Sequence, residues 1–314
     1  MRRLPGMWGR RRYEEASVKK KSGLSYSNFY YYLLLIAPLF LIYIVFFIVP
    51  VVSSLFLSMT NYNGLSLDVK FTGLNNYIVA FSDKVFRKAM WNTILFAGLA
   101  TLLQNGLALL LALGLNAKIK GRGFMRMLVF APCMISPIIT AFVWQFIFMP
   151  EGLLNRMLGA VGIGRMDKAW LGSVDTALVC VVCAHVWMWI GYSATIYLSN
   201  LSNMSEDITE AARIDGCSRM NLFRYITFPM LAPATTINIT LAFTQSLKVF
   251  DIVYAMTNGG PLNATETVGT YVIRNMGLNL HGYASAMTVL LMFVIILTGT
   301  VLIGRLKKRE AEIY

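Results

Sequence analysis

Residues 89–117 read AMWNTILFAGLATLLQNGLALLLALGLNA, 29 residues without a single Asp, Glu, Lys or Arg. About 20 apolar residues suffice to cross the hydrocarbon core of a bilayer as an α-helix, so this stretch predicts a transmembrane helix. Five further uncharged windows of at least 23 residues have the same character: 22–67, 127–150, 176–205, 225–247 and 275–304. The sequence therefore predicts an all-α, polytopic membrane protein with six transmembrane helices.

The composition of the 314 residues agrees with this prediction. Hydrophobic residues make up 57% of the chain and charged residues 14%, whereas a soluble domain carries about 25% charge. A transmembrane β-barrel would show strands of about 10 residues with alternating polarity, and no stretch of this sequence alternates over that length. These observations exclude a water-soluble enzyme and an outer-membrane barrel.

The net charge of +13 is unevenly distributed along the chain. Nineteen of the 28 Lys and Arg residues precede the first predicted span, follow the last, or lie between spans two and three or four and five. Eight lie in the opposite loops, and Lys248 lies within a span. The positive-inside rule then places both termini in the cytoplasm of a multi-pass protein. Topology and anionic lipid explain the basic excess, so no nucleic acid is expected as a partner.

The predicted organisation has three parts. A basic cytoplasmic arm, 1–28, precedes the transmembrane domain, 29–304, and a short cytoplasmic tail, 305–314, follows it. A short amphipathic helix from Asn75 to Phe86 is expected on the outer membrane surface. The six spans are expected at residues 30–56, 92–116, 125–148, 175–200, 229–252 and, for the last, up to Gly304.

The loop between spans four and five, residues 202–229, reads SNMSEDITEAARIDGCSRMNLFRYITFP. Ser205 or Asp207 can cap a helix whose acidic first turn complements the helix dipole, and Gly216 is expected to end it. A second short helix then leads to Pro229. Such a rigid, charged element is suited to being bound by another protein; the plainer alternative is a solvated amphipathic linker.

This loop resembles the E-A-A-x3-G-x9-I-x-L-P signature of permease subunits of binding-protein-dependent ABC importers, and departs from it only at Phe228. In that family the loop is a coupling helix that docks into the ATPase subunit, and the residue matching Glu210 pairs with a basic residue there. The resemblance implies ATPase coupling through Glu210, Ala211, Ala212, Asp215, Gly216, Ile226 and Pro229. Other segments resemble the carbohydrate branch of the family: 71–77, Asn92-Thr93, 248–251 and 257–261.

The resemblance, which covers about residues 30–304, implies the MetI-like fold of type I importer permeases in a bacterial cytoplasmic membrane. It also implies four partners: a second homologous permease, ATPase subunits, an extracytoplasmic solute-binding protein, and a sugar, with oligosaccharides favoured. The chain lacks a phosphate-binding G-x-x-x-x-G-K-[ST] motif, so it is not expected to be an enzyme, and ATP and Mg²⁺ would be bound by the partner ATPase. No cofactor or metal is expected, because Cys180 and Cys183, close to His185, suit packing in a helix.

The alternative function is a self-sufficient secondary transporter or channel. That class predicts internal repeats and membrane-buried carboxylates for ion coupling. Asp251 is the one candidate carboxylate, and such a protein would have no use for the coupling loop.

Candidate residues for a sugar path lie on spans four and five. His185, Trp189 and Tyr192 share one helical face at i, i+4 and i+7, and Gln245 and Ser246 lie on span five. Aromatic faces and inward-pointing polar groups suit a sugar, and the resemblance points to the same two helices. The alternative is that these side chains only pack between helices.

Two further expectations concern the surroundings of this path. Val186 is expected to face lipid, away from the path. Lys248 and Asp251, one turn apart, are expected to neutralise each other locally.

Overall fold

A computed structural model describes the backbone of residues 26–66, 68–117, 120–162 and 168–311. The predicted basic arm, 1–28, lies outside these residues except for its last three, which begin the first helix. The chain divides into two compact units, residues 1–53 and 54–314.

The first predicted span is one helical stretch of three parts: α2 (Tyr26–Tyr43), the π-helical turn η1 (Ile44–Ile48) and α3 (Val49–Leu57). The 26 apolar residues Tyr32–Leu57 are long enough to cross a bilayer, at about 1.5 Å per residue. The π turn ends two residues before Pro50, whose ring would clash with the carbonyl four residues earlier in a regular helix. A wider turn at this point accommodates the proline.

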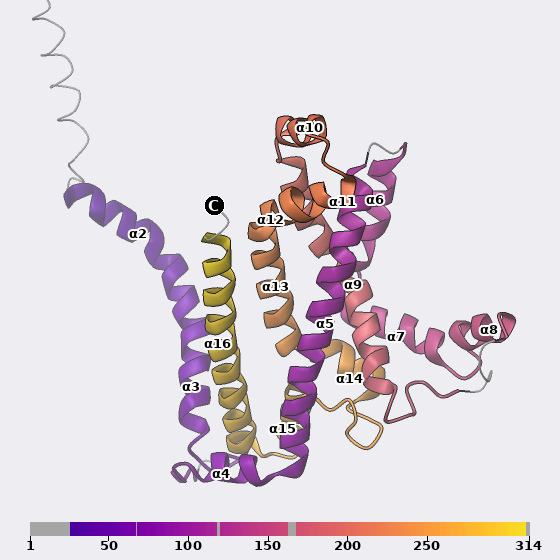
Figure 1. Ribbon diagram of the computed structural model, residues 1–314. Coiled ribbons are helices and arrows are strands. Elements are labelled where there is room, and N and C mark those ends of the chain that lie inside the picture. The colour runs from indigo at the N-terminus through magenta and orange to yellow at the C-terminus, as the bar shows by residue number, and fades with distance from the viewer. Residues whose placement is uncertain (1–25, 67, 118–119, 163–167, 312–314) are drawn as a thin grey trace, which may run out of the picture. The chain divides into compact units, whose positions relative to one another are not determined.

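Four long or medium helices dominate the second unit: α5 (Lys84–Asn116), α9 (Ala177–Ser202), α13 (Ala232–Leu247) and α16 (His281–Ala311). Figure 1 shows them side by side, with α5 packed against both α9 and α13, and α16 packed against α13. Within the described residues of both units, five helices are long and apolar enough to cross a membrane, or six if one bent pair counts as a span. The expected number of spans and the all-α class are confirmed.

Small side chains let α5 approach its neighbours closely. Its buried residues include Ala89, Ala97, Ala100, Ala108 and Ala112. Such residues bring helix backbones together in membranes, where burial of apolar surface gives little driving force.

Polar side chains then link the packed helices. Gln104 Nε2 donates to Ser193 Oγ at 2.8 Å, and Tyr197 Oη donates to Asn105 Oδ1 at 3.1 Å. Asn238 of α13 donates to the carbonyl of Ser193 at 3.1 Å. These buried bonds join α5, α9 and α13 inside the bundle.

The bounds expected for the third span, 125–148, do not match a single helix of the structure. The segment consists of α6 (Arg122–Phe130), a 3₁₀ turn, η2 (Ala131–Met134), and α7 (Pro137–Phe148). Pro132 and Pro137 stand at the first positions of η2 and α7, where a missing N–H is tolerated. Figure 1 shows α7 directed away from α9 at a large angle, and it is followed by α8 (Leu153–Ala160) within the predicted external loop.

The boundaries of spans two, five and six also differ from expectation. Span two begins at Lys84 instead of residue 92. Span five ends at Leu247, and a separate helix, α14 (Asp251–Thr257), follows. Helix α16 continues through Gly304 to Ala311, so the predicted tail is helical as far as the structure describes it.

At the end of the second unit opposite α10, Asp83 joins three helices. Its Oδ2 accepts hydrogen bonds from Tyr271 Oη of α15 (Val268–Gly277) at 2.6 Å and from Tyr283 Oη of α16 at 2.9 Å. Its Oδ1 accepts from the Val85 N–H, which caps α5. Partial burial opposes ionisation of Asp83, but these bonds outweigh burial and lower the pKa of the carboxyl below its usual value. The predicted surface helix is α4 and ends at Ser82, one residue before this cap.

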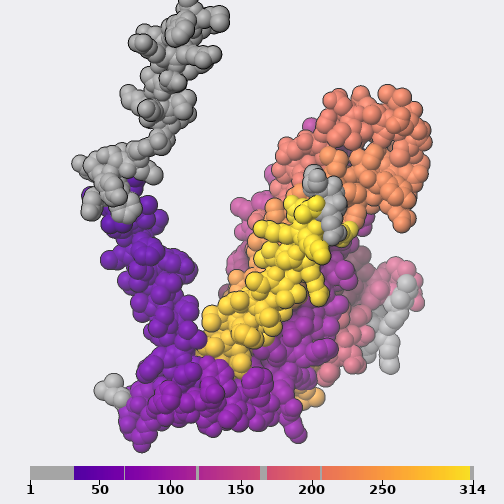
Figure 2. Space-filling model, turned by 60° about the vertical axis from the view of Figure 1, so that its left-hand side comes forward, coloured from indigo at the N-terminus to yellow at the C-terminus, as the bar shows by residue number. Residues whose placement is uncertain are grey.

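Helix α16 has one face that is uncovered within its unit, as Figure 2 shows in yellow. Phe293, Ile296, Leu297 and Val301 are exposed along it. Such a surface requires a membrane or another subunit around it.

Candidate functional site

The predicted coupling helix is α10 (Glu206–Ile214). Ser205 is its N-cap, with Oγ accepting from the Asp207 N–H at 3.2 Å. Gly216 follows with φ +81°, a left-handed conformation that glycine adopts without steric cost, and the Cys217 N–H bonds back to the Ala212 carbonyl at 3.0 Å. The predicted start and end of this helix are confirmed.

After Gly216 the chain forms α11 (Arg219–Leu222), the π turn η3 (Phe223–Thr227) and α12 (Phe228–Met230). The π turn again precedes a proline, Pro229, as it does in the first span. The stretch Arg219–Met230 meets α13 at an angle of 65°. The coupling segment is therefore joined to span five through a defined bend.

The signature residues divide into buried and exposed groups. Ala212 is buried, and Ile226 and Pro229 are half-buried, so these residues hold the segment against the rest of the chain. Glu210, Ala211, Asp215 and Gly216 are exposed. The structure thus leaves the acidic side of α10 open at one end of the unit, the end that Figure 1 shows at the top.

Large apolar side chains of the same segment are also exposed. Ile214 is 86% exposed, Met220 71% and Tyr225 67%. A polar cavity of about 780 Å³ lies beside them, and Glu210 lines it together with Arg122, Arg213 and Arg219. This end of the molecule offers a protein partner apolar anchors among charges of both signs.

The predicted path residues lie at the contact of α9 and α13. His185 is buried, with Nε2 at 3.3 Å from Ser246 Oγ and its ring at 5.2 Å from that of Phe96. His185, Trp189 and Gln245 line a cavity of about 270 Å³. The structure therefore brings four of the five predicted residues to one place, Ser246 through its bond to His185.

Tyr192 lies beside this cavity without lining it. Its ring packs edge-on against that of Trp189, with centroids 6.2 Å apart. Val186, expected to face lipid, is buried in the apolar core, so that expectation is wrong. Val179, 51% exposed, is an uncovered position on the same helix.

Lys248 and Asp251 also line the cavity, and both are exposed. They form no ion pair within 4 Å in the described structure, because Lys248 ends α13 and Asp251 begins α14 in a new direction. The expected mutual neutralisation is therefore wrong. Both charges are directed to solvent-accessible space near His185 and Gln245.

Possible metal ligands are dispersed among the described residues, which contain no group of three His, Cys, Asp or Glu suited to an ion. Cys180 is buried in the core, and Cys183 is exposed. The two thiols and His185 form no common site.

Sequence reasoning assigned no role to Asn92, which lies in a motif of the sugar branch. Its Nδ2 donates to the carbonyls of Asn263, Ala264 and Glu266 at 3.2, 3.1 and 3.0 Å. Thr93 Oγ1 accepts from the Val268 N–H at 3.0 Å. This pair anchors the loop between α14 and α15 onto α5. An Asn-Thr pair near the end of an apolar helix was the signal available in the sequence.

The same loop contains a buried ion pair. Arg274 Nη2 lies 2.5 Å from Glu266 Oε2, and the Glu266 side chain is fully buried. Burial raises the pKa of Glu266, and Thr270 and Arg274 offset part of this effect. Leu262, at the tip of the loop, is 82% exposed and has a positive φ of 48°. A well-anchored loop thus presents a strained, exposed tip.

Residues 104–311 match the protein family described as "Binding-protein-dependent transport system inner membrane component". The chain belongs to this family. Among its relatives, the trehalose/maltose transport system permease protein MalF of Thermococcus litoralis is 32% identical to this permease over 91% of the present chain and 98% of the relative. The sn-glycerol-3-phosphate transport system permease protein UgpA of Agrobacterium fabrum is 34% identical over 84% and 90% of the two chains.

A solved structure shares the fold of this permease. It is a bacterial alginate ABC transporter in complex with an alginate pentasaccharide-bound periplasmic protein, and a chain of it superposes with a TM-score of 0.77 at 20% identity. The match covers 88% of the present chain and 93% of that chain. The resemblance drawn from the coupling loop and the expected MetI-like fold are confirmed.

Proposed function

We propose that this chain is one of two homologous permease subunits of an ABC importer that takes up a sugar or a related polyol phosphate. The family is that of binding-protein-dependent transport, and relatives named for trehalose/maltose and glycerol phosphate transport support the substrate class. An extracytoplasmic solute-binding protein would deliver the substrate. A self-sufficient transporter or channel is not favoured, since the coupling segment would then have no partner.

One observation carries the coupling role: α10 exposes Glu210 together with the unpacked side chain of Ile214. A large aliphatic side chain that is 86% exposed beside an acidic group suits burial in a cleft of another protein. The proposed occupant is an ATPase subunit, which binds ATP and Mg²⁺ because this chain has no phosphate-binding loop. Both termini would then lie in the cytoplasm, on the side of α10.

The test is charge reversal at the exposed carboxylate. Glu210→Lys should abolish ATPase co-purification or uncouple ATP hydrolysis from uptake, while the solute-binding protein still binds on the other side. Glu151→Lys, an exposed charge reversal away from α10, is the matched control and should transport normally. Undiminished uptake and ATPase retention in Glu210→Lys would refute the coupling role.

The cavity lined by His185, Trp189 and Gln245 is the proposed sugar contact region. It combines an indole face with an amide, an imidazole and the exposed charges of Lys248 and Asp251. Aromatic faces stack on the apolar faces of sugar rings, and the polar groups can bind hydroxyls. Its volume of about 270 Å³ suits one sugar ring rather than a whole oligosaccharide. Longer chains would pass through it in steps.

A further inference from the structure

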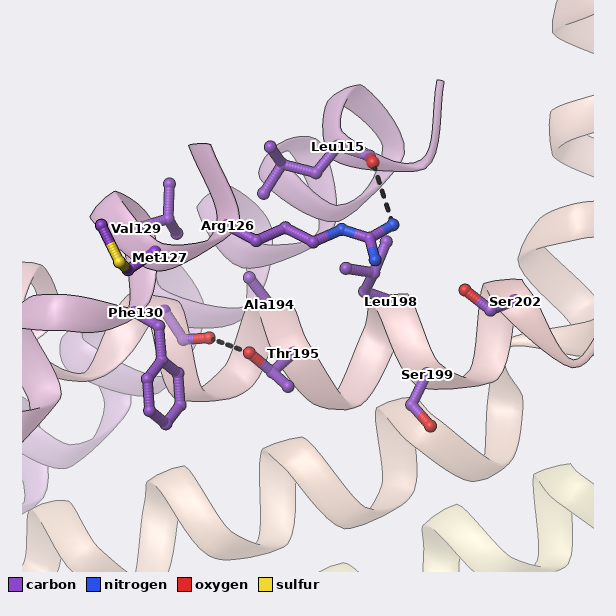
Figure 3. A pocket seen from close by; sticks show the side chains of 11 residues that line it. Leu115, Arg126, Met127, Val129, Phe130, Ala194, Thr195, Leu198, Ser199 and Ser202 are labelled. Carbon is purple, nitrogen blue, oxygen red and sulfur yellow. Dashed lines mark hydrogen bonds between the residues drawn. The ribbon is translucent and has the colours of Figure 1, made fainter. Parts of the chain in front are cut away.

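A third cavity, of about 440 Å³, lies between the ends of α5 and α6 and the second half of α9 (Figure 3). Its walls are mainly apolar and contain one charged residue, Arg126. The cavity is at the end of the unit that carries α10 (Figure 1). The lining residues used below are Leu115, Arg126, Phe130, Leu198, Ser199 and Ser202.

The groove exists because α6 and α9 touch at one point and separate beyond it. At Gly191 a side chain would collide with the backbone carbonyl of Val129, so the helices are in direct backbone contact there. Toward Ser199 and Ser202 no such contact closes the gap, and Figure 3 shows these hydroxyls along the edge of the opening. The result is an apolar groove that is closed near Gly191 and lined by polar groups near Arg126.

The guanidinium of Arg126 is held in place at the polar end. Its Nη2 donates to the carbonyl of Leu115 at 3.3 Å, one of the last carbonyls of α5, which have no partner within the helix. Its Nε is buried and has no hydrogen-bond partner among the described residues. An arginine has five N–H donors in a rigid fork, so the two hydrogens of Nη1 and one of Nη2 remain for an anion.

We propose that this groove binds an anionic phospholipid, with the phosphate on Arg126 and part of an acyl chain along Phe130 and Leu198. A phosphate can accept one bond from Nη1 and one from the hydrogen of Nη2 that Leu115 leaves free, the two terminal nitrogens of the guanidinium fork. The Ser202 hydroxyl, which Figure 3 shows directed toward the groove, can donate to a remaining oxygen. Basic pockets between transmembrane helices on the positively charged side of a membrane protein suit anionic headgroups, and Arg122, Arg213 and Arg219 line the cavity beside α10 at this end of the unit.

The lining distinguishes a lipid from a sugar in transit. A sugar needs polar partners around the ring, whereas the exposed surface of the walls here is mainly apolar, and the hydroxyls all come from one helix, α9. An acyl chain needs such walls, and its headgroup needs one cation at interface depth. The site has a cation beside an apolar groove, which matches the anionic headgroup and the apolar acyl chain of one phospholipid.

The experiment measures retention of dioleoylphosphatidylglycerol by the full-length chain, purified in detergent with the subunits it assembles with. Native mass spectrometry during titration with this lipid, and separately with dioleoylphosphatidylcholine, gives apparent dissociation constants. Arg126→Ala should weaken phosphatidylglycerol binding about tenfold or more, the effect expected for losing a charge-assisted contact. Arg126→Lys should bind phosphatidylglycerol with an affinity between those of Arg126→Ala and the wild type.

Two variants make the result specific. Arg305→Ala removes an exposed positive charge of α16 at the same end of the unit and should bind phosphatidylglycerol like the wild type. Ser199→Trp places a large ring at an exposed groove position, so it should fold yet displace the lipid. The proposal is overturned if Arg126→Ala and Ser199→Trp both bind as the wild type does, or if phosphatidylcholine binds equally well. It is also overturned if the transported sugar displaces the lipid, since the groove would then belong to the transport path.

Discussion

Asn92 provides the sharpest test of how the outer loop is held. The amide nitrogen of its side chain has two hydrogens for three carbonyl acceptors at 3.0 to 3.2 Å, so at least one hydrogen is shared. We therefore count two full bonds of about 1 kcal/mol each. Asn92→Ala also leaves buried carbonyls unsatisfied, and the total local cost becomes about 2–4 kcal/mol.

Hydrogen exchange measured by mass spectrometry reports this cost directly. The amides of Ala264 and Thr265 donate to loop carbonyls at 2.8 and 3.3 Å and exchange only when the loop opens. A loss of about 2–4 kcal/mol should accelerate their exchange about 30-fold to several hundred-fold. Asn63→Ala is the control, because Asn63 caps a surface turn through its own side chain and does not touch this loop.

The pattern of acceleration decides the outcome. Faster exchange confined to the loop, with α9 unaffected, supports the assigned role of Asn92. Unchanged exchange at Ala264 and Thr265 would refute it. Equal acceleration throughout the protein would also refute it, because Asn92 would then stabilise the whole fold and not this loop.

Three further predictions concern transport, topology and pH. Tyr192→Ala removes an aromatic face beside Trp189, so it should lower sugar uptake in a transport assay while assembly with the ATPase survives. Val179→Ala, on the exposed side of α9, is the control and should transport normally. The reverse result would place the path on the other face of α9. A cysteine at Asn263 should react with an impermeant maleimide in whole cells and Cys217 only after permeabilisation; the opposite labelling pattern would invert the topology. The pKa of Asp83 is lowered in the folded protein, so its stabilising bonds are fully present above the ordinary value of 3.8 and are lost as pH falls through the lower folded value. Thermal stability of the wild type should therefore drop more steeply below pH 3.8 than that of Asp83→Asn.

The sequence contained enough to predict the membrane class, the number of spans and the coupling helix. Long uncharged windows predict the membrane class and the number of spans, because a helix is one of the few structures that satisfy the backbone hydrogen bonds inside a bilayer. The helix start at Ser205 and the stop at Gly216 follow from local capping chemistry, which operates within a few residues. Such features need no knowledge of distant contacts.

The sequence could not predict features that depend on neighbouring helices. Pro132 is compatible with either a kink or a complete break in the helix of the third span. The break depends on how η2 packs against α9, which the sequence does not reveal. Val186 and Val179 are the same residue type on the same helix, yet one is buried and the other exposed. Asn92 bonds to carbonyls more than 170 positions away, and no local pattern specifies that partner.

The 65° bend between Arg219–Met230 and α13 has a mechanical consequence. The 12-residue arm before the bend is about 18 Å long at 1.5 Å per residue, while α13 runs directly to Lys248 beside the proposed sugar cavity. Opening the bend by about 10° would displace the far end of the arm by about 3 Å, the length of one hydrogen bond. Because α13 has 16 residues and is about 24 Å long, the same rotation about the bend would displace its cavity end by about 4 Å. A movement of the coupling segment would therefore reach the proposed sugar cavity slightly enlarged.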